Sequence, residues 1–377
     1  MMLARPTPAL LDPRQTRGRM IQIKRTGLDR RHAGSNETGS PQMIEHSRQA
    51  LVGAFGARYV SLAIADIDEL SVSNFALLST ADFEQPMQAV ERYLASIPRC
   101  PNKVSLALAG TVEGDAATFT HRNWKLSRND VRAATRADHV CLINDVEASA
   151  LVLPNLSAYD LQELHAGAAV PYGNKAVLMA GAAVGIAGLV RAGKDWVPIV
   201  GEGGFLRFVL TKEDLAELGT DFLAERYVAC DDVFTGAGLA GLYEALVAKA
   251  KVKAKSSGAK QIAAFGLSGE DPVATRALQI MATWLGRVAG DIALLYGARG
   301  GLYMGGGLVA NIIPALQTGH FREAFESRGE RSAYIAKVPV KVIKTAADAG
   351  LRGAAIAMAR SLPSHPAASR PTARAAS

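Results

Sequence analysis

The stretch LVGAFGARYVSLAIA, residues 51–65, places two apolar runs on either side of a turn that contains Gly56. Short apolar runs bounded by turn residues are typical of buried strands, so the stretch predicts a strand, a turn and a second strand. A similar opening occurs at residues 176–191, where AVLMA runs into GAAVG and IAGLVR follows. The repetition predicts an internal duplication, with the second half of the chain repeating the plan of the first.

Strand and helix signals alternate along the rest of the chain. Further strands are expected at residues 72–76, 104–109, 140–143, 301–304 and 338–343. Helices are expected at residues 83–97, 127–134, 212–227, 238–251, 272–296 and 350–360. Such alternation is typical of an α/β protein.

Length and composition point to a soluble chain with two lobes. The 377 residues exceed what one hydrophobic core usually organises. No run approaches the roughly 18 to 20 apolar residues of a membrane span, and the N-terminus lacks a signal-type apolar segment. The three cysteines, Cys100, Cys141 and Cys230, are far apart and lack metal-ligand spacing. We therefore expect a cytoplasmic protein with buried free thiols, no structural zinc and no membrane partner.

The formal net charge of +7 belongs mainly to the ends of the chain. Residues 1–45 hold eight Arg and Lys against four Asp and Glu, and residues 361–377 hold two Arg and no acid. Their Pro, Ser, Gly and Ala content predicts disorder in an arm of residues 1–46 and a tail of residues 362–377. The arm contains no aromatic residues, so at most a weak attraction to nucleic acid is expected, without a specific partner. Met20 or Met43 is an alternative start.

Polar and glycine-rich motifs follow several of the expected strands. They are Gly114-Asp115 with Thr120 and Trp124, Ile143-Asn144-Asp145, Gly201-Glu202-Gly203-Gly204, the stretch TGAGLAGLY at 235–243, Gly306-Gly307, and FREAFESRG at 321–329. Glycines beside a polar residue let backbone approach a ligand closely.

Taken together, these motifs resemble those of the bacterial glucokinases, over roughly residues 51–358. The resemblance implies a duplicated actin-like ATPase fold, related to ribonuclease H, with two lobes around a central cleft. It implies a small lobe of residues 47–154 completed by 346–361, and a large lobe of residues 155–345. The implied reaction transfers phosphate from ATP, with Mg²⁺, to a hexose, most simply glucose, and a homodimer is possible.

The resemblance also implies roles for single residues. Asp145 stands where these kinases have the general base that accepts the proton of the sugar hydroxyl. The alternative is that Asp145 only caps a helix starting near Ala148. Asn144 and Glu202 resemble ligands of sugar hydroxyls, although Glu202 could also be a plain turn residue.

Three further sugar ligands are implied at positions that differ from the family pattern. Thr120 and His121 lie in a THRNW segment where the family has T-N-H-x-W, and His121 is either a replacement ligand or no ligand. Asp231 stands where a glutamate is expected, and Phe205 where a histidine is expected. These changes predict weak glucose binding.

Both phosphate-binding turns depart from the pattern. The first, D-x-G-G-T-N in the family, reads AFGARY at 54–59, so that Ala54 replaces the aspartate that anchors the metal. The second, G-x-G-T-G, reads MAGAA at 179–183. Arg58 either supplies a substitute charge to a phosphate or is simply solvated. We assign no protein metal ligand. The glycines expected at the nucleotide are Gly53, Gly56, Gly181, Gly185, Gly305, Gly306 and Gly307, of which the last three could instead serve strand–helix packing.

Two interpretations of function remain open from the sequence. The first is an ATP-dependent hexose kinase with reduced or retuned activity. The second is a catalytically silent relative that senses sugar or binds a partner. A third, a sugar-responsive repressor, would need a helix-turn-helix domain before Leu51, and the preceding residues are too few and too irregular for one.

Overall fold

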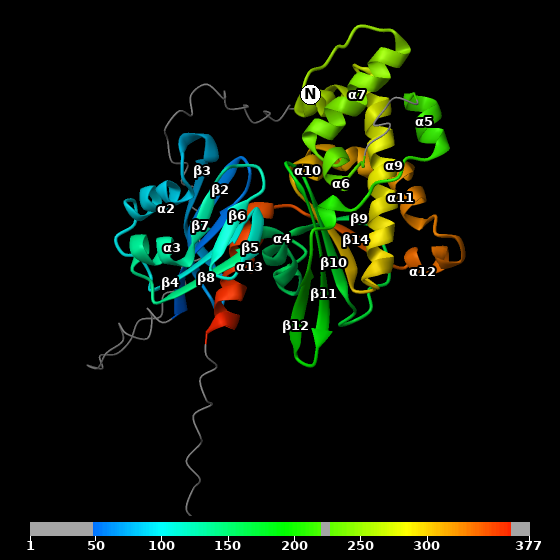
Figure 1. Cartoon of the computed structure of the whole chain (residues 1–377). Helices are drawn as coiled ribbons and strands as arrows, with labels where there is room; N and C mark the ends of the chain where they lie inside the picture. Colours follow the sequence, from blue (N-terminus) through cyan, green and yellow to red (C-terminus); the bar gives the residue numbers. More distant parts are fainter. Residues whose placement is uncertain (1–47, 220–226, 363–377) are drawn as a thin grey trace, which may run out of the picture.

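The computed structural model describes residues 48–219 and 227–362. The disorder predicted for the arm and the tail, and the alternative starts at Met20 and Met43, lie outside the described residues. So does the end of the helix predicted at residues 212–227. Figure 1 shows two lobes, each built on a central sheet.

The first sheet contains five strands in the order β3-β2-β1-β4-β8. Their bounds are β1 (Gln49–Phe55), β2 (Tyr59–Asp66), β3 (Val72–Ser79), β4 (Lys103–Leu108) and β8 (His139–Asn144). Strand β1 pairs antiparallel with β2 and parallel with β4, and β4 pairs parallel with β8. Residues 51–65 therefore form the hairpin at the centre of this sheet.

The second sheet repeats this plan. Its order is β12-β11-β10-β13-β14-β9. The bounds are β9 (Leu161–His165), β10 (Lys175–Ala180), β11 (Val184–Ala192), β12 (Asp195–Val200), β13 (Gly301–Gly305) and β14 (Val340–Ile343). Strand β10 pairs antiparallel with β11 and parallel with β13, and β13 pairs parallel with β14. The predicted duplication is confirmed in strand order and direction, with β9 as an additional edge strand.

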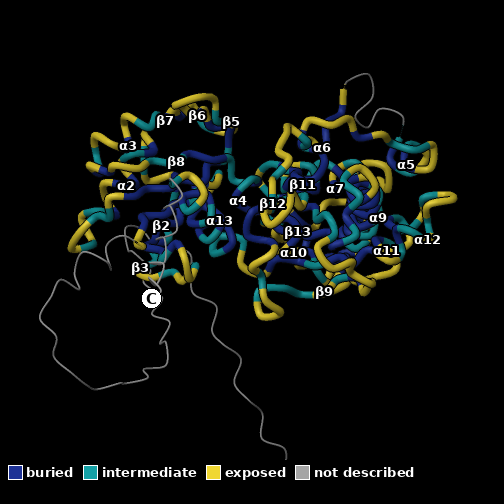
Figure 2. Tube along the Cα trace, turned by 90° about the horizontal axis from the view of Figure 1, so that it is seen from below, coloured by how far each residue is buried: buried dark blue, intermediate teal, exposed yellow. Residues whose placement is uncertain are grey.

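Helices cover both faces of the first sheet. The helices are α2 (Pro86–Leu94), α3 (Arg128–Thr135), α4 (Asp145–Leu151) and α13 (Ala346–Ser361). Helices α2 and α3 pack over one core cluster, while α4 and α13 share a separate alanine-rich cluster on the other face. Helix α13 comes from the C-terminal end of the chain and contacts β1 and β4. Helix α4 contacts β10 and β11 as well, so it lies between the two sheets, as Figures 1 and 2 show.

A small antiparallel sheet and four 3-10 turns complete the first half and the connections. The small sheet is β5 (Gly110–Glu113), β6 (Ala116–Phe119) and β7 (Lys125–Ser127). The 3-10 turns are η2 (Thr80–Asp82), η3 (Leu153–Asn155), η4 (Gly203–Phe205) and η5 (Gly329–Arg331). The sequence analysis missed this sheet because its strands are three or four residues long and only partly apolar.

The large lobe carries most of the helices and the largest core cluster. The helices are α5 (Lys212–Leu218), α6 (Cys230–Val233), α7 (Gly236–Ala250), α8 (Ala259–Ser268), α9 (Pro272–Leu295), α10 (Gly307–Leu316), α11 (Gly319–Glu326) and α12 (Ser332–Ile335). Among the described residues, α9 is the one helix long and apolar enough to cross a membrane, and 67% of its apolar window is buried inside the protein. A buried core helix meets the same criteria, and Figure 2 shows the buried residues gathered at the centre of each lobe.

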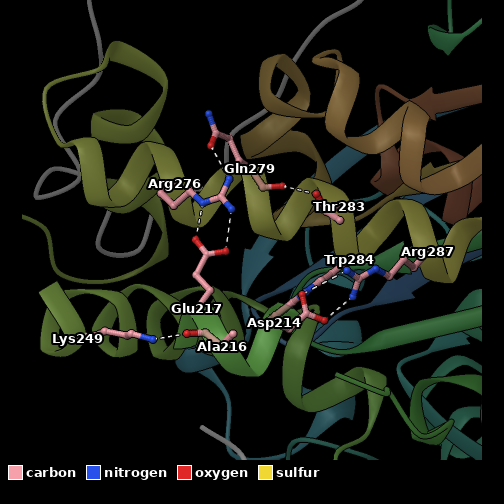
Figure 3. A network of polar contacts seen from close by, with 9 residues as sticks. All are labelled: Asp214, Ala216, Glu217, Lys249, Arg276, Gln279, Thr283, Trp284 and Arg287. Atoms are coloured by element: carbon pink, nitrogen blue, oxygen red, sulfur yellow. Dashed lines mark hydrogen bonds and ion pairs between the residues drawn. The ribbon is translucent and has the colours of Figure 1, made fainter. Parts of the chain in front are cut away.

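A polar network fixes α5 on α9 (Figure 3). The Trp284 indole donates to Asp214 Oδ1 over 2.9 Å, and Arg287 forms an ion pair of 2.5 Å with Asp214 Oδ2. Arg276 binds both carboxylate oxygens of Glu217 at 2.5 and 2.7 Å. Burial acts to raise the pKa of Asp214, but the hydrogen bonds from Arg287 and Trp284 outweigh it, and the pKa is lowered. The network therefore holds a charged residue in the wall of the large lobe.

The cysteine prediction holds only in part. All three thiols are free, and Cys230 is buried, but Cys100 and Cys141 are half-buried. The helix predicted at residues 238–251 is α7, which ends at Ala250; a loop follows, and α8 starts at Ala259.

Candidate active site in the cleft between the lobes

The buried residue Thr80 holds the β1–β2 turn through hydrogen bonds. Its hydroxyl donates to the carbonyl of Ala57 over 2.9 Å, and its backbone N–H donates to the carbonyl of Arg58 over 3.0 Å. Arg122 in turn donates to the Thr80 hydroxyl over 3.1 Å. These bonds hold the turn at the edge of the cleft in one conformation.

Strand β8 ends at Asn144, and α4 begins at the next residue. The Asn144 side-chain oxygen accepts from the N–H groups of Val146 at 2.8 Å and Glu147 at 3.2 Å, so Asn144 is the N-cap. Its amide nitrogen donates to the carbonyl of Gly110 over 2.9 Å. The alternative in which Asp145 caps a helix near Ala148 is wrong, because the helix starts earlier and the preceding residue supplies the cap.

Two cavities meet at Asp145. The larger, about 830 Å³, extends from the β1–β2 turn across to α8 and α10, and the smaller, about 240 Å³, extends toward η4. The walls of both cavities include Gly56, Asp145, Met179, Gly181, Ala182 and Gly307. Both lobes contribute to this shared wall, which places Asp145 at the junction of the two compartments.

The Asp145 carboxyl group is half-buried, and its pKa is raised to about 6. Burial is the main cause, and the negative charge of Glu202 adds to it, while the N–H groups of Val146 and of Asp145 itself oppose it. A carboxylate with this pKa is ionised near neutral pH and remains a moderately strong base, as proton abstraction requires.

The predicted sugar ligands are brought together at the smaller cavity. Its wall contains Asn144, Glu202, Thr120, His121 and Asp231, with Phe205 beside them. The sequence separates these residues by up to 111 positions, so the fold alone makes them neighbours.

The two acidic residues of this set, Glu202 and Asp231, also make contacts within the protein. Thr111 of β5 donates to Glu202 Oε1 over 3.5 Å, a contact that crosses from one lobe to the other. Asp231 Oδ1 accepts from the N–H of Val184 over 2.6 Å and so holds the end of the β10–β11 turn. Asp231 and His121 also line a neighbouring cavity of about 500 Å³.

The predicted nucleotide glycines divide into three groups. Gly56, Gly181 and Gly307 line the larger cavity as expected. Gly185 and Gly306 line the smaller cavity instead. Gly53 and Gly305 are buried within strands and line neither cavity.

Local packing leaves no room for a Cβ at Gly53, Gly305 and Gly306. A Cβ on Gly53 would lie 2.7 Å from Leu106, and one on Gly305 would lie 2.8 Å from the Met179 sulfur. Gly306 has φ of +93°, and a Cβ there would collide with the carbonyl of Ala180. For Gly305 and Gly306 the nearest atoms belong to strand β10, so strand–helix packing stays a prediction.

The described lining of the larger cavity offers a magnesium ion a single carboxylate. Mg²⁺ is usually held by one or two carboxylates together with substrate phosphates and water. Asp145 is the one carboxylate among the described residues that line the larger cavity. Position 54 carries only a methyl group, packed against Gly350 of α13. Across residues 48–219 and 227–362, no group of three His, Cys, Asp or Glu side chains could hold a metal ion.

The sequence analysis missed the contribution of α8. Its first turn and the preceding loop supply Ser257, Lys260 and Gln261 to the larger cavity, and α10 supplies Asn311. No local pattern marks these residues, because they lie about 200 positions from the turn that they face.

The chain is similar to known proteins over most of its length. The sequence model of one protein family, described as Glucokinase, matches residues 51–361. The glucokinase of Saccharophagus degradans is 31% identical over 294 residues, which are 78% of this chain and 92% of that protein. A crystal structure of glucokinase from an Antarctic psychrotroph superposes with a TM-score of 0.72 at 31% identity, covering 83% of this chain and 99% of that one.

A more distant structure shares the fold. It is a ROK family glucokinase from Streptomyces griseus, in complex with glucose and AMPPNP, with a TM-score of 0.59 at 17% identity. The match covers 83% of this chain and 99% of that one.

Proposed function

The chain belongs to the glucokinase family, and from this premise we propose that it transfers the γ-phosphoryl group of ATP to glucose, with Asp145 as general base. The observation that carries the proposal is the position of Asp145 at the junction of the two cavities. A sugar in the smaller cavity and a triphosphate in the larger one would both reach the same carboxylate.

Asp145 acts on the proton of the attacking hydroxyl. As the sugar oxygen attacks the terminal phosphorus, the carboxylate accepts this proton, and the bond between phosphorus and ADP breaks. Asn144 caps α4 and thereby fixes the backbone from which Asp145 extends. With a pKa of about 6, Asp145 is ionised above that pH, so turnover should fall as the pH drops below 6.

The smaller cavity is the proposed sugar site. Glu202, Thr120, His121 and Asp231 offer carboxylate, hydroxyl and imidazole groups to sugar hydroxyls. Asn144 already uses its amide in the α4 cap and with Gly110, so any contact with the sugar is shared with that role.

The larger cavity is the proposed ATP site. Gly56, Gly181 and Gly307 leave room for backbone to approach phosphate oxygens. Mg²⁺ enters the proposal as a partner of ATP rather than as a ligand of the protein.

The lobe boundaries belong to the same proposal. We place residues 47–154 with 346–361 in the small lobe and 155–345 in the large lobe, and the packing of α13 on β1 and β4 supports this division. Cytoplasmic location and a homodimer stay predictions.

Turnover tests the proposal directly. Purified protein with Mg-ATP and millimolar glucose should yield glucose 6-phosphate. Asp145→Asn should lower kcat by about 10² to 10⁴-fold, the usual contribution of a general base, with an unchanged circular dichroism spectrum. Glu147→Gln is the matched control, because Glu147 lies on the same helix and lines neither cavity.

Absence of turnover on any hexose would contradict the kinase proposal. If glucose then raised the Tm and Mg-ATP did not, the silent sugar-sensing alternative would take its place.

A further inference from the structure

We propose that Arg58 and Lys260 bind the phosphate groups of the nucleotide directly, in place of a carboxylate-held metal ion. The inference rests on the proposed function, because it assumes that ATP occupies the larger cavity. It assigns the positive charge at the phosphates to two side chains that line the same cavity from different lobes.

The charges of the larger cavity come from three side chains. Among the described lining residues, Arg58 and Lys260 are cationic and Asp145 is anionic. A triphosphate brought next to Asp145 carries several negative charges, and like charges at close range repel strongly. Without compensating cations, ATP and the ionised base would oppose each other.

Arg58 and Lys260 come from different lobes. Arg58 lies in the β1–β2 turn, and Lys260 lies in the first turn of α8. Within residues 48–219 and 227–362, no hydrogen bond or ion pair of the Arg58 guanidinium or the Lys260 ammonium group is present. Both cations are therefore available to an anionic ligand in the cavity.

The backbone under Arg58 is fixed. Thr80 binds the carbonyls of Ala57 and Arg58, and Gly56 donates to the carbonyl of Tyr59 over 3.0 Å. A braced turn reduces the entropy lost when the side chain orders on a ligand. The guanidinium can then bind two phosphate oxygens at once, whereas Lys260 acts as a compact point charge.

The alternative, a protein-bound metal ion, would have to share its one carboxylate with the proposed base. Ala54 offers no side-chain oxygen at the turn, and Asp145 is the one carboxylate among the described lining residues. Direct cationic contacts supply the charge neutralisation that phosphoryl transfer needs. Nucleotide binding should therefore depend little on Mg²⁺.

Calorimetric titration of the full chain tests this inference. ATP should bind in excess EDTA with an affinity within about tenfold of that measured with Mg²⁺. Arg58→Gln and Lys260→Ala should each weaken ATP binding by about tenfold or more, as expected for charge-assisted contacts. Both variants should also weaken the binding of inorganic tripolyphosphate. They should leave the affinity for adenosine unchanged, because adenosine has no phosphate.

Matched controls separate this effect from a general loss of surface charge. Arg132→Ala on α3 and Lys253→Ala in the loop before α8 remove exposed cations that line neither the larger nor the smaller cavity, and ATP affinity should not change. Added salt should weaken ATP binding more in the wild type than in the Arg58→Gln, Lys260→Ala double variant.

The outcomes separate this inference from the proposed function. If Mg-ATP supports turnover but EDTA abolishes ATP binding, or if both variants bind ATP like the wild type, the inference is wrong and the kinase function stands. If ATP binds in EDTA and the variants weaken it while no hexose is phosphorylated, the inference stands and the kinase function fails. A variant that no longer binds adenosine has lost its fold, and Arg58→Lys then replaces Arg58→Gln, with a smaller loss expected.

Discussion

Two neighbouring side chains at the end of β8 perform separate tasks, although they differ by a single functional group. Asn144 is neutral, and it satisfies the first free N–H groups of α4. Asp145 is ionisable and is directed to the junction of the cavities. Because Asn144 supplies the cap, the Asp145 carboxylate is not needed to cap α4.

The raised pKa of Asp145 predicts a cost in stability at neutral pH. Its pKa rises from 3.8 to about 6 on folding, so the folded state prefers the neutral form. The resulting stabilisation is full below pH 4 and is lost as the pH rises through 6. At pH 8 Asp145→Asn should therefore raise the free energy of unfolding by at most about 3 kcal/mol, at about 1.4 kcal/mol per pKa unit.

Urea unfolding at pH 8 and at pH 4 measures this difference. The gain should disappear at pH 4, where both side chains are neutral. An equal gain at both pH values, or a loss at pH 8, would show that ionisation of Asp145 is not strained in the folded protein.

At the scale of elements, the start of α4 connects helix capping with the proposed catalytic role of Asp145. Asn144→Ala removes the cap and the bond to Gly110, and should cost about 1 to 2 kcal/mol of stability. It should also lower kcat, because Asp145 loses its fixed backbone. Ser127→Ala, which removes the cap of α3, should cost about 1 kcal/mol and leave kcat unchanged.

Denaturant unfolding and steady-state kinetics on both variants test whether the Asn144 cap affects kcat as well as stability. Equal kcat values in the wild type and the Asn144 variant would show that the cap contributes only to folding.

The contact between α4 and α13 depends on a glycine. A Cβ on Gly353 would collide with the carbonyl of Ala148, so the two helices meet backbone to backbone. Gly353→Ala should therefore destabilise the protein by about 1 to 3 kcal/mol. Gly241→Ala in α7 meets no atom within 4 Å and should stabilise it by about 0.5 to 1 kcal/mol.

Thermal unfolding of the two variants makes this comparison. The same sign of change in both would mean that helix propensity, rather than the α4–α13 contact, determines the effect.

At the scale of the whole molecule, two sheets of like topology face a common cleft, with α4 in contact with both. The Thr111–Glu202 contact joins the lobes at the proposed sugar site, and Arg58 and Lys260 line the proposed nucleotide site from different lobes. Ligands that touch both walls favour the closed arrangement, since they bind it more tightly.

Closure can be measured without turnover in the Asp145→Asn variant. Glucose together with Mg-ATP should decrease the radius of gyration in small-angle X-ray scattering. Mannitol at the same concentration should leave it unchanged. An unchanged radius at saturating glucose and Mg-ATP would mean that the lobes do not move on binding.

The central strands of both sheets and the duplication could be predicted from the sequence, because short apolar runs and turn glycines encode local backbone preferences, and the resemblance to the glucokinases singled out Asp145. The sharing of a cavity could not be predicted in this way. The fold brings Lys260 and Arg58 to one cavity, buries Gly53 and Gly305 within strands, and makes Asn144 the cap of α4. The physical reason is that a cavity wall is assembled from segments up to about 300 positions apart, and how these segments meet depends on how the two lobes pack and not on any local pattern.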